Sequence, residues 1–298
     1  MITVSPHPTH LFTLTASTNG PTVFLDIFAI KELAKGDPER RRRFIAMLDR
    51  GVEVMFSVAN AAELSGPQGS SFDKMREFLD EIGPRWFPME FDPYICLERE
   101  RDKKDPTTCC FSDRLLKVFT ATHIRRSPNI KIEDLPEALP ADFFRLGLFM
   151  EWLAPQRQNI IEGKAQMGER LKDQILAHRA KYERDASWLE AKFPMLPFRT
   201  DCPATFVYIN LVRRLILESK SRVLTSNDGI DFGQAVVASA YATVATLDKH
   251  WKRRVEILPK PSRLARIYYG QELDQMVRDL ERNLDNAALR RGRAVSSN

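Results

Sequence analysis

Two short apolar segments, residues 22–26 and 243–248, each end in an aspartate. They run Thr-Val-Phe-Leu-Asp and Thr-Val-Ala-Thr-Leu-Asp, and are rich in the β-branched and apolar side chains of strands buried on both faces. Such strands occur almost only in parallel sheets, because helices cover both sides of these sheets. We therefore expect a parallel sheet in which Asp26 and Asp248 stand at the carboxyl ends of two strands.

Strand-like and helix-like segments alternate over the first hundred residues. The pattern predicts further strands at 52–57 and 85–90, and helices at 27–34, 38–50, 58–64 and 71–82. The second of these helices opens with Asp37 and Pro38, a capping residue followed by proline in the first turn. Alternation of this kind is typical of an α/β fold around a parallel sheet.

The alternation stops near residue 100 and returns near residue 226. Between these points the pattern predicts helices at 111–122, 141–152, 156–192 and 203–220; after them it predicts a helix at 230–242, strands at 243–247 and 255–258 around a short helix at 249–254, and a charged helix at 271–291. We divide the chain into an N-terminal extension (1–20), a first core part (21–100), a mostly α-helical insertion (101–225), a second core part (226–260) and a C-terminal helix with a basic tail (261–298). The sheet is thus expected to draw strands from both ends of the chain.

The composition excludes several classes of protein. No segment approaches the roughly 18 apolar residues of a membrane span, and the N-terminus lacks the basic-then-apolar pattern of a secretory signal. The four cysteines and five histidines show no spacing typical of a zinc site. We expect a soluble cytoplasmic protein that makes no membrane contact and uses no zinc.

The charge is unevenly distributed along the chain. Residues 1–100 together with 226–248 hold 11 Lys/Arg against 18 Asp/Glu, whereas residues 101–225 hold 22 against 16 and residues 249–298 hold 12 against 6. An acidic core flanked by basic segments suits a protein that grips the phosphates of a nucleic acid and keeps its own acids for metal.

Four acidic residues fall where a site is expected. In an open parallel sheet, ligands bind beyond the carboxyl ends of the strands. Asp26 and Asp248 end two predicted strands, and Glu63 and Asp231 lie in helices that begin near the same edge. We call Asp26, Glu63, Asp231 and Asp248 the acid cluster.

Carboxylates brought together in a partly buried place repel one another and lose hydration, so a cation or a shared proton must neutralise them. Hard oxygen ligands select Mg²⁺ or Mn²⁺. Such ions activate water for attack on a phosphodiester and stabilise the leaving oxygen. The pattern therefore predicts metal-dependent nuclease chemistry.

Four motifs in order resemble those of PIN-domain ribonucleases: Val-Phe-Leu-Asp at 23–26, Ser-Val-Ala-Asn-Ala-Ala-Glu-Leu at 57–64, Asn-Asp-Gly-Ile-Asp at 227–231, and Thr-Val-Ala-Thr-Leu-Asp at 243–248. The resemblance covers about 115 residues in two blocks. It implies a three-layer α/β/α fold, and Mg²⁺- or Mn²⁺-dependent hydrolysis of RNA rather than DNA.

The resemblance also implies a role for each matching residue. The acid cluster would bind metal and carry catalysis, with Asp228 as a further ligand. Hydrogen bonds to the acids or to the scissile phosphate would come from Ser57, Asn227 and Thr246. Gln234 departs from the family, which often carries histidine there.

Simpler roles remain open for the same acids. The role of Asp26 and Asp231 could be no more than to cap helices. Asp248 could form an Asx-turn, and Glu63 could be an exposed helix residue. A haloacid-dehalogenase-like phosphatase would need a second aspartate where this chain has Phe28. A PIN-like scaffold that binds RNA or protein without cutting stays open. So do roles as a toxin with an antitoxin or other protein regulator, as an RNA-processing enzyme or as a defence effector, and the formation of a homodimer.

Overall fold

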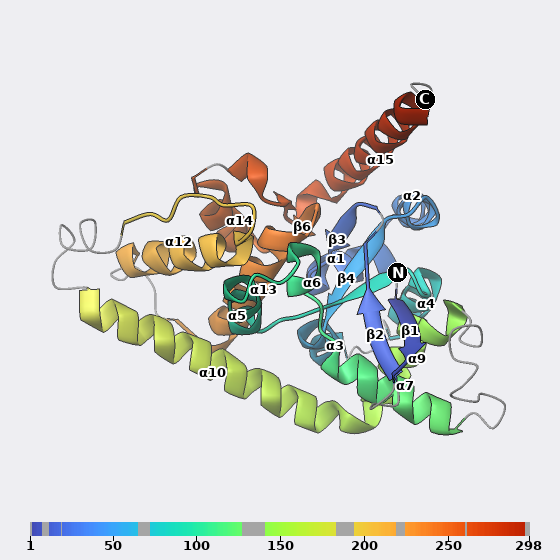
Figure 1. Cartoon of the computed structure of the whole chain (residues 1–298), viewed down its shortest axis with the longest axis horizontal. Helices are drawn as coiled ribbons and strands as arrows, with labels where there is room; N and C mark the ends of the chain where they lie inside the picture. Colours follow the sequence, from blue (N-terminus) through green and yellow to red (C-terminus); the bar gives the residue numbers. More distant parts are fainter. Residues whose placement is uncertain are drawn as a thin grey trace.

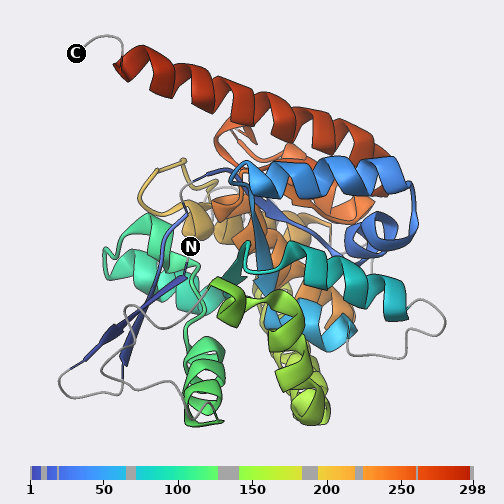
Figure 2. The same cartoon turned by 90° about the vertical axis from the view of Figure 1, so that its right-hand side faces the viewer.

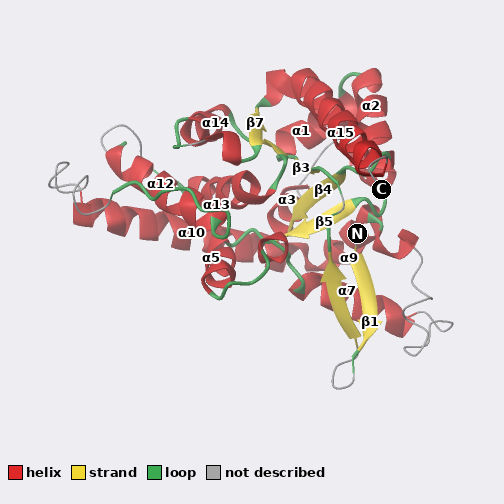
Figure 3. Cartoon of the chain, turned by 45° about the horizontal axis from the view of Figure 1, so that its top comes forward, coloured by secondary structure: helices red, strands yellow, loops and turns green. Residues whose placement is uncertain are grey.

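The computed structural model describes residues 2–7, 12–18, 20–64, 72–126, 141–182, 194–218, 224–259 and 261–295. Its centre is a parallel sheet of five strands in the order β5-β4-β3-β6-β7. The strands are β3 (Thr22–Phe24), β4 (Glu53–Ser57), β5 (Trp86–Met89), β6 (Val244–Thr246) and β7 (Arg266–Tyr268). This confirms an α/β fold around a parallel sheet (Figure 3).

The two halves of the chain meet at β3. Val23 pairs with Val54 of β4 on one side and with Val244 of β6 on the other. Val23 and Phe24 are fully buried, as expected of a strand covered on both faces. The prediction that strands from both ends of the chain form one sheet is therefore confirmed.

Chain order places the helices on the two faces of this sheet. From β3 the chain moves outward to β4 and β5, and it later moves the other way from β6 to β7. Because parallel crossovers are right-handed, connections running in opposite directions lie on opposite faces. Accordingly α1 (Ile27–Lys35), α2 (Pro38–Asp49) and α4 (Phe72–Ile82) contact one another, while α13 (Ser226–Tyr241) contacts α14 (Lys249–Glu256). The direction of the connections thus reverses between β3 and β6, and open α/β sheets bind ligands beyond the carboxyl ends of the strands at such a point.

One predicted strand is wrong. Residues 255–258 do not form a strand, because α14 continues to Glu256 and the fifth strand is β7. Asp248 caps the start of this helix, and Trp251 and Val255, four residues apart, are both buried on its inner face. The apolar residues here follow a helical period.

The extension predicted for residues 1–20 contains two strands that we did not predict from the sequence. Strands β1 (Ile2–Pro6) and β2 (Phe12–Ala16) pair antiparallel in a separate two-stranded sheet. Val4, Phe12 and Leu14 are buried against the core.

Between β5 and α13 the regular elements of the described residues are helices. They are α5 (Pro93–Arg101), α6 (Pro106–Cys109), α7 (Arg114–Arg126), η3 (Ala141–Phe144), α9 (Leu146–Leu153), η4 (Ala154–Gln156), α10 (Arg157–Tyr182) and α12 (Pro203–Leu217). Figure 1 shows α10 as a long helix that runs past α13 and α5 toward α3 (Val58–Leu64). The segment therefore brings α10 against both core helices that carry predicted site residues.

The last helix, α15 (Leu273–Val295), lies along α2 (Figure 2). Arg40 pairs with Asp274, Arg43 with Glu281 and Arg50 with Asp285 across this contact. Much of the arginine run at 40–43 thus joins two helices of the same face. No helix in the described ranges combines the length and apolar character that crossing a bilayer requires.

Candidate active site

Asp26 lies two residues after β3 and hydrogen-bonds to the other half of the chain through Thr246, the last residue of β6. The Asp26 backbone N–H donates to Thr246 Oγ1 at 2.7 Å, and the Thr246 hydroxyl donates to Asp26 Oδ1 at 3.0 Å. Asp26 Oδ1 also accepts the N–H of Ala29 at 2.8 Å, so Asp26 is the N-cap of α1. The carboxylate is thereby held between the carboxyl ends of β3 and β6.

Asp248 stands in the equivalent position two residues after β6. Its Oδ1 accepts the backbone N–H groups of His250 at 2.7 Å and Trp251 at 2.8 Å, which makes it the N-cap of α14. Both aspartates therefore do act as caps. Among the described residues, the cap bonds of Asp26 and Asp248 use Oδ1 alone, and no hydrogen bond engages Oδ2.

Glu63 lies near the end of α3 and forms an ion pair with Lys164 of α10. The Lys164 side chain is only 17% exposed and that of Glu63 31%. The partner of this acid thus comes from the helical segment between β5 and β6.

Asp231 lies in the second turn of α13 and does not cap it. The N-cap is Thr225, which forms a capping box with Asp228. Asp228 Oδ2 accepts the N–H of Thr225 at 2.8 Å and its hydroxyl at 2.9 Å. Asp228 is buried and Asn227 is exposed in the same turn.

The electrostatics place these acids within reach of one another. Burial raises the pKa of Asp231 to about 7, assisted by the charges of Asp248, Glu63 and Asp228 and opposed by that of Lys164. Burial likewise raises the pKa of Asp26, and the charges of Asp248 and Glu63 add to this. Asp26 and Asp231 therefore each lie within electrostatic range of Asp248 and Glu63.

The carboxylates do not converge further than this. In the described part of the chain, no three acidic, histidine or cysteine side chains are arranged as the ligands of one metal ion. The ammonium group of Lys164 is the cation that contacts the cluster in this arrangement.

Ser57 bonds to Asn60. Its hydroxyl donates to Asn60 Oδ1 at 2.7 Å, and its backbone N–H donates to the same oxygen at 3.0 Å. The Asn60 amide then donates to the carbonyl of Leu25 at 3.1 Å. Asn60 is 0% exposed and links the carboxyl ends of β3 and β4. Asn60 was not among the residues predicted for the site. Its signal is a single polar side chain within the otherwise apolar segment Val-Ala-Asn-Ala-Ala.

Gln234 lies one turn after Asp231 on the same helix. It is 7% exposed, and its Nε2 is a buried donor for which the described residues supply no acceptor. Buried polar groups nearly always have a partner, so an orphan donor near the acid cluster points to a bound water or ligand group.

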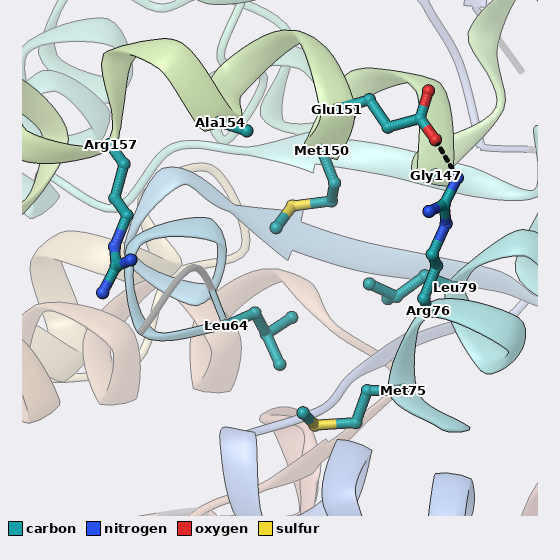
Figure 4. A pocket seen from close by; sticks show the side chains of 9 residues that line it. All are labelled: Leu64, Met75, Arg76, Leu79, Gly147, Met150, Glu151, Ala154 and Arg157. Carbon is teal, nitrogen blue, oxygen red and sulfur yellow. Dashed lines mark hydrogen bonds and ion pairs between the residues drawn. The ribbon is translucent and has the colours of Figure 1, made fainter. Parts of the chain in front are cut away.

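A separate cavity lies behind α3. It has a volume of about 300 Å³ and an apolar lining that includes Leu64, Met75 and Met150, and Arg76 pairs with Glu151 at its rim (Figure 4). No member of the acid cluster lines it. This cavity is therefore separate from the candidate site at the carboxyl ends of β3 and β6.

The groove beside Asp248 has a different character. It has a volume of about 690 Å³ and is lined by residues of α12 and α14, including His250, Arg253 and Arg254. His250 and Arg253 are exposed, whereas Arg214 and Arg254 pair with Glu218. Three arginines and two glutamates therefore line the groove, and the exposed Arg253 is one of these arginines.

Comparison with known proteins adds no assignment to this geometry. No protein-family model matches the chain, and neither a curated protein nor a solved structure shows significant similarity to it.

Proposed function

We propose that this chain is a Mg²⁺- or Mn²⁺-dependent nuclease that hydrolyses the phosphodiester bonds of RNA at the acid cluster. The observation that supports this proposal is the gathering of four carboxylates, two from each half of the chain, at the reversal point of a parallel sheet. Mutual repulsion and burial make such a cluster unfavourable unless cations neutralise it.

The chemistry of these donors suits a hard divalent ion, because every candidate ligand is a carboxylate oxygen. The hydrogen bonds that orient Asp26 and Asp248 use Oδ1, so Oδ2 of each would be offered to the metal, and Asp231 and Glu63 would supply the other oxygens. Thr246 would keep Asp26 oriented, as outer partners of metal ligands do. Asp228 fixes the start of α13 and adds its charge next to Asp231. When bound, the ion would activate water and stabilise charge on the phosphate.

The substrate class follows from charge. The groove lined by α12 and α14 presents the exposed Arg253, on the helix that Asp248 caps, and phosphate contacts by basic side chains supply much of the affinity for a nucleic acid backbone. The choice of RNA over DNA rests on the resemblance of the motifs to PIN-domain ribonucleases.

The test uses end-labelled single-stranded RNA and DNA of the same sequence, incubated with the full chain in Mn²⁺ or Mg²⁺. We expect RNA cleavage that leaves 5′-phosphate ends, stops with EDTA and falls by at least about 100-fold in Asp26→Asn and Asp231→Asn. Asp73→Asn, at an exposed position of α4, is the matched control and should cleave like the wild type.

Persistent cleavage in Asp26→Asn would remove the acid cluster from the mechanism. If the wild type cuts neither nucleic acid with either metal but retains RNA on a filter, the non-catalytic scaffold replaces the nuclease. Cleavage of DNA alone would overturn the choice of substrate.

A further inference from the structure

Helix α10 crosses the start of α13 with the two backbones in direct contact. A Cβ atom on Gly168 would lie 2.3 Å from the carbonyl oxygen of Ser226, and one on Gly229 would lie 2.2 Å from the carbonyl oxygen of Gly168. Any side chain at either position would push the helices apart. The two glycines therefore set the register of α10 against the helix that carries Asp231.

A second contact holds the same helix. Arg170 pairs with Asp92 at 2.7 Å, and its guanidinium lies over the ring of Tyr94. Asp92 is buried and caps the start of α5. Helix α10 is thus attached to α5 as well as to α13, at points half a turn apart.

Lys164 lies one helical turn before Gly168, on the same face of α10. The docking of α10 directs its ammonium group to Glu63, and its charge also lowers the pKa of Asp231. The side chain is largely covered, so its charge is screened by solvent far less than an exposed lysine would be. A helix outside the two core parts therefore places a fixed positive charge within the acid cluster.

We propose that Lys164 is a phosphate-binding residue of the active site, which competes with the divalent ion for Glu63 and contacts the scissile phosphate once the ion is bound. This proposal rests on the nuclease function. An ammonium group and a divalent cation repel each other, so both cannot lie against the Glu63 carboxylate at full strength. Release from Glu63 leaves three N–H donors next to the place where negative charge develops on the phosphate.

Two measurements on Lys164→Met test the proposal, because they should change in opposite directions. With Mn²⁺ alone and no substrate, Lys164→Met should bind the metal about tenfold more tightly than the wild type, because the competing charge is lost. Isothermal titration calorimetry or the electron paramagnetic resonance signal of free Mn²⁺ measures this affinity. With saturating Mn²⁺ and RNA, kcat should fall about 100-fold while KM changes little.

Two further variants serve as controls. Lys164→Arg keeps the charge, so it should bind Mn²⁺ like the wild type and retain cleavage within about tenfold. Lys172→Met removes a lysine that pairs with Glu169 on the same helix, and both measurements should stay at wild-type values.

A structural role for Lys164 predicts a different result, since a displaced helix would weaken metal binding and cleavage together. That outcome, or wild-type cleavage by Lys164→Met, would overturn the proposal. If the wild type cleaves no substrate, the nuclease function fails. The Mn²⁺ affinities would still decide whether Lys164 competes for the site.

Discussion

The hydroxyl of Thr246 bridges two parts of Asp26, lying 2.7 Å from its backbone nitrogen and 3.0 Å from its carboxylate oxygen Oδ1. These two residues are 220 positions apart in the chain. The contact thus both links the carboxyl ends of β3 and β6 and sets the orientation of a proposed metal ligand.

Replacing Thr246 by valine should therefore affect both stability and activity. The variant keeps the shape but leaves the buried partners without their hydrogen bonds, which should lower the free energy of unfolding by about 1–3 kcal/mol. Urea denaturation measures the first effect and RNA cleavage the second. Thr246→Ser retains the hydroxyl and should keep most activity; equal cleavage by the valine and serine variants would mean that this bond does not orient Asp26.

Asn60 holds the ends of β3 and β4 together, and its loss should be costly. Asn60→Ala removes the acceptor of the buried N–H and O–H groups of Ser57 and the amide donor to the Leu25 carbonyl, so we expect a loss of about 1–3 kcal/mol in unfolding free energy. Asn159→Ala, at an exposed position of α10, should stay within about 0.5 kcal/mol of the wild type. A similar unfolding midpoint for the two variants would contradict this account.

Metal should stabilise the folded chain through the acid cluster. A divalent ion that binds only the folded state relieves the repulsion among the carboxylates, and at about 100 times its dissociation constant it adds about 2.7 kcal/mol. We expect Mn²⁺ to raise the Tm of the wild type and of Asp73→Asn, and EDTA to reverse the rise. An equal rise in the double variant Asp26→Asn/Asp231→Asn would place the ion elsewhere.

Two glycines of α10 should respond in opposite ways to the same substitution. Gly163 has open space around it, so Gly163→Ala should stabilise the chain by about 0.5–1 kcal/mol through helix propensity alone. Gly168→Ala should destabilise it by about 1–3 kcal/mol, because the added methyl meets the backbone of α13. Thermal unfolding of the pair is the measurement. Equal effects would show that α10 does not dock where Gly168 places it.

The central strands could be predicted because their signal is local. Residues 22–24 and 244–246 are apolar or threonine and all buried, and each segment is followed within two residues by an aspartate that caps a helix. For Asp26 and Asp248, the apolar pattern before the aspartate, its position at the carboxyl end of a strand and its suitability as a helix cap all indicate the same place in the fold.

Short apolar segments were more ambiguous. Val255 and its neighbours suit a strand by composition, and only the cap at Asp248 and the burial of Trp251 show that the helical period applies. The hairpin β1-β2 did carry a signal, since Phe12, Leu14 and Ala16 alternate with polar residues.

Lys164 lay beyond any local pattern. Its place beside Glu63 depends on where α10 crosses α13, and the backbone contact of Gly168 with α13 sets that crossing. A glycine within a helical pattern, such as Gly168, is tolerated at some cost in stability, but it does not indicate which other helix packs against it.

The sheet order has a consequence for the chain as it is synthesised. Strand β3 is complete by residue 24, but its second neighbour, β6, begins only at Val244. At about 5–20 residues per second, a ribosome needs on the order of 10–40 seconds to span that interval. Throughout it, the central strand of the finished protein is an open edge on which other chains can pair. Translation stalled before residue 244 would leave that edge uncovered, so a truncated product would be aggregation-prone and would also lack Asp248.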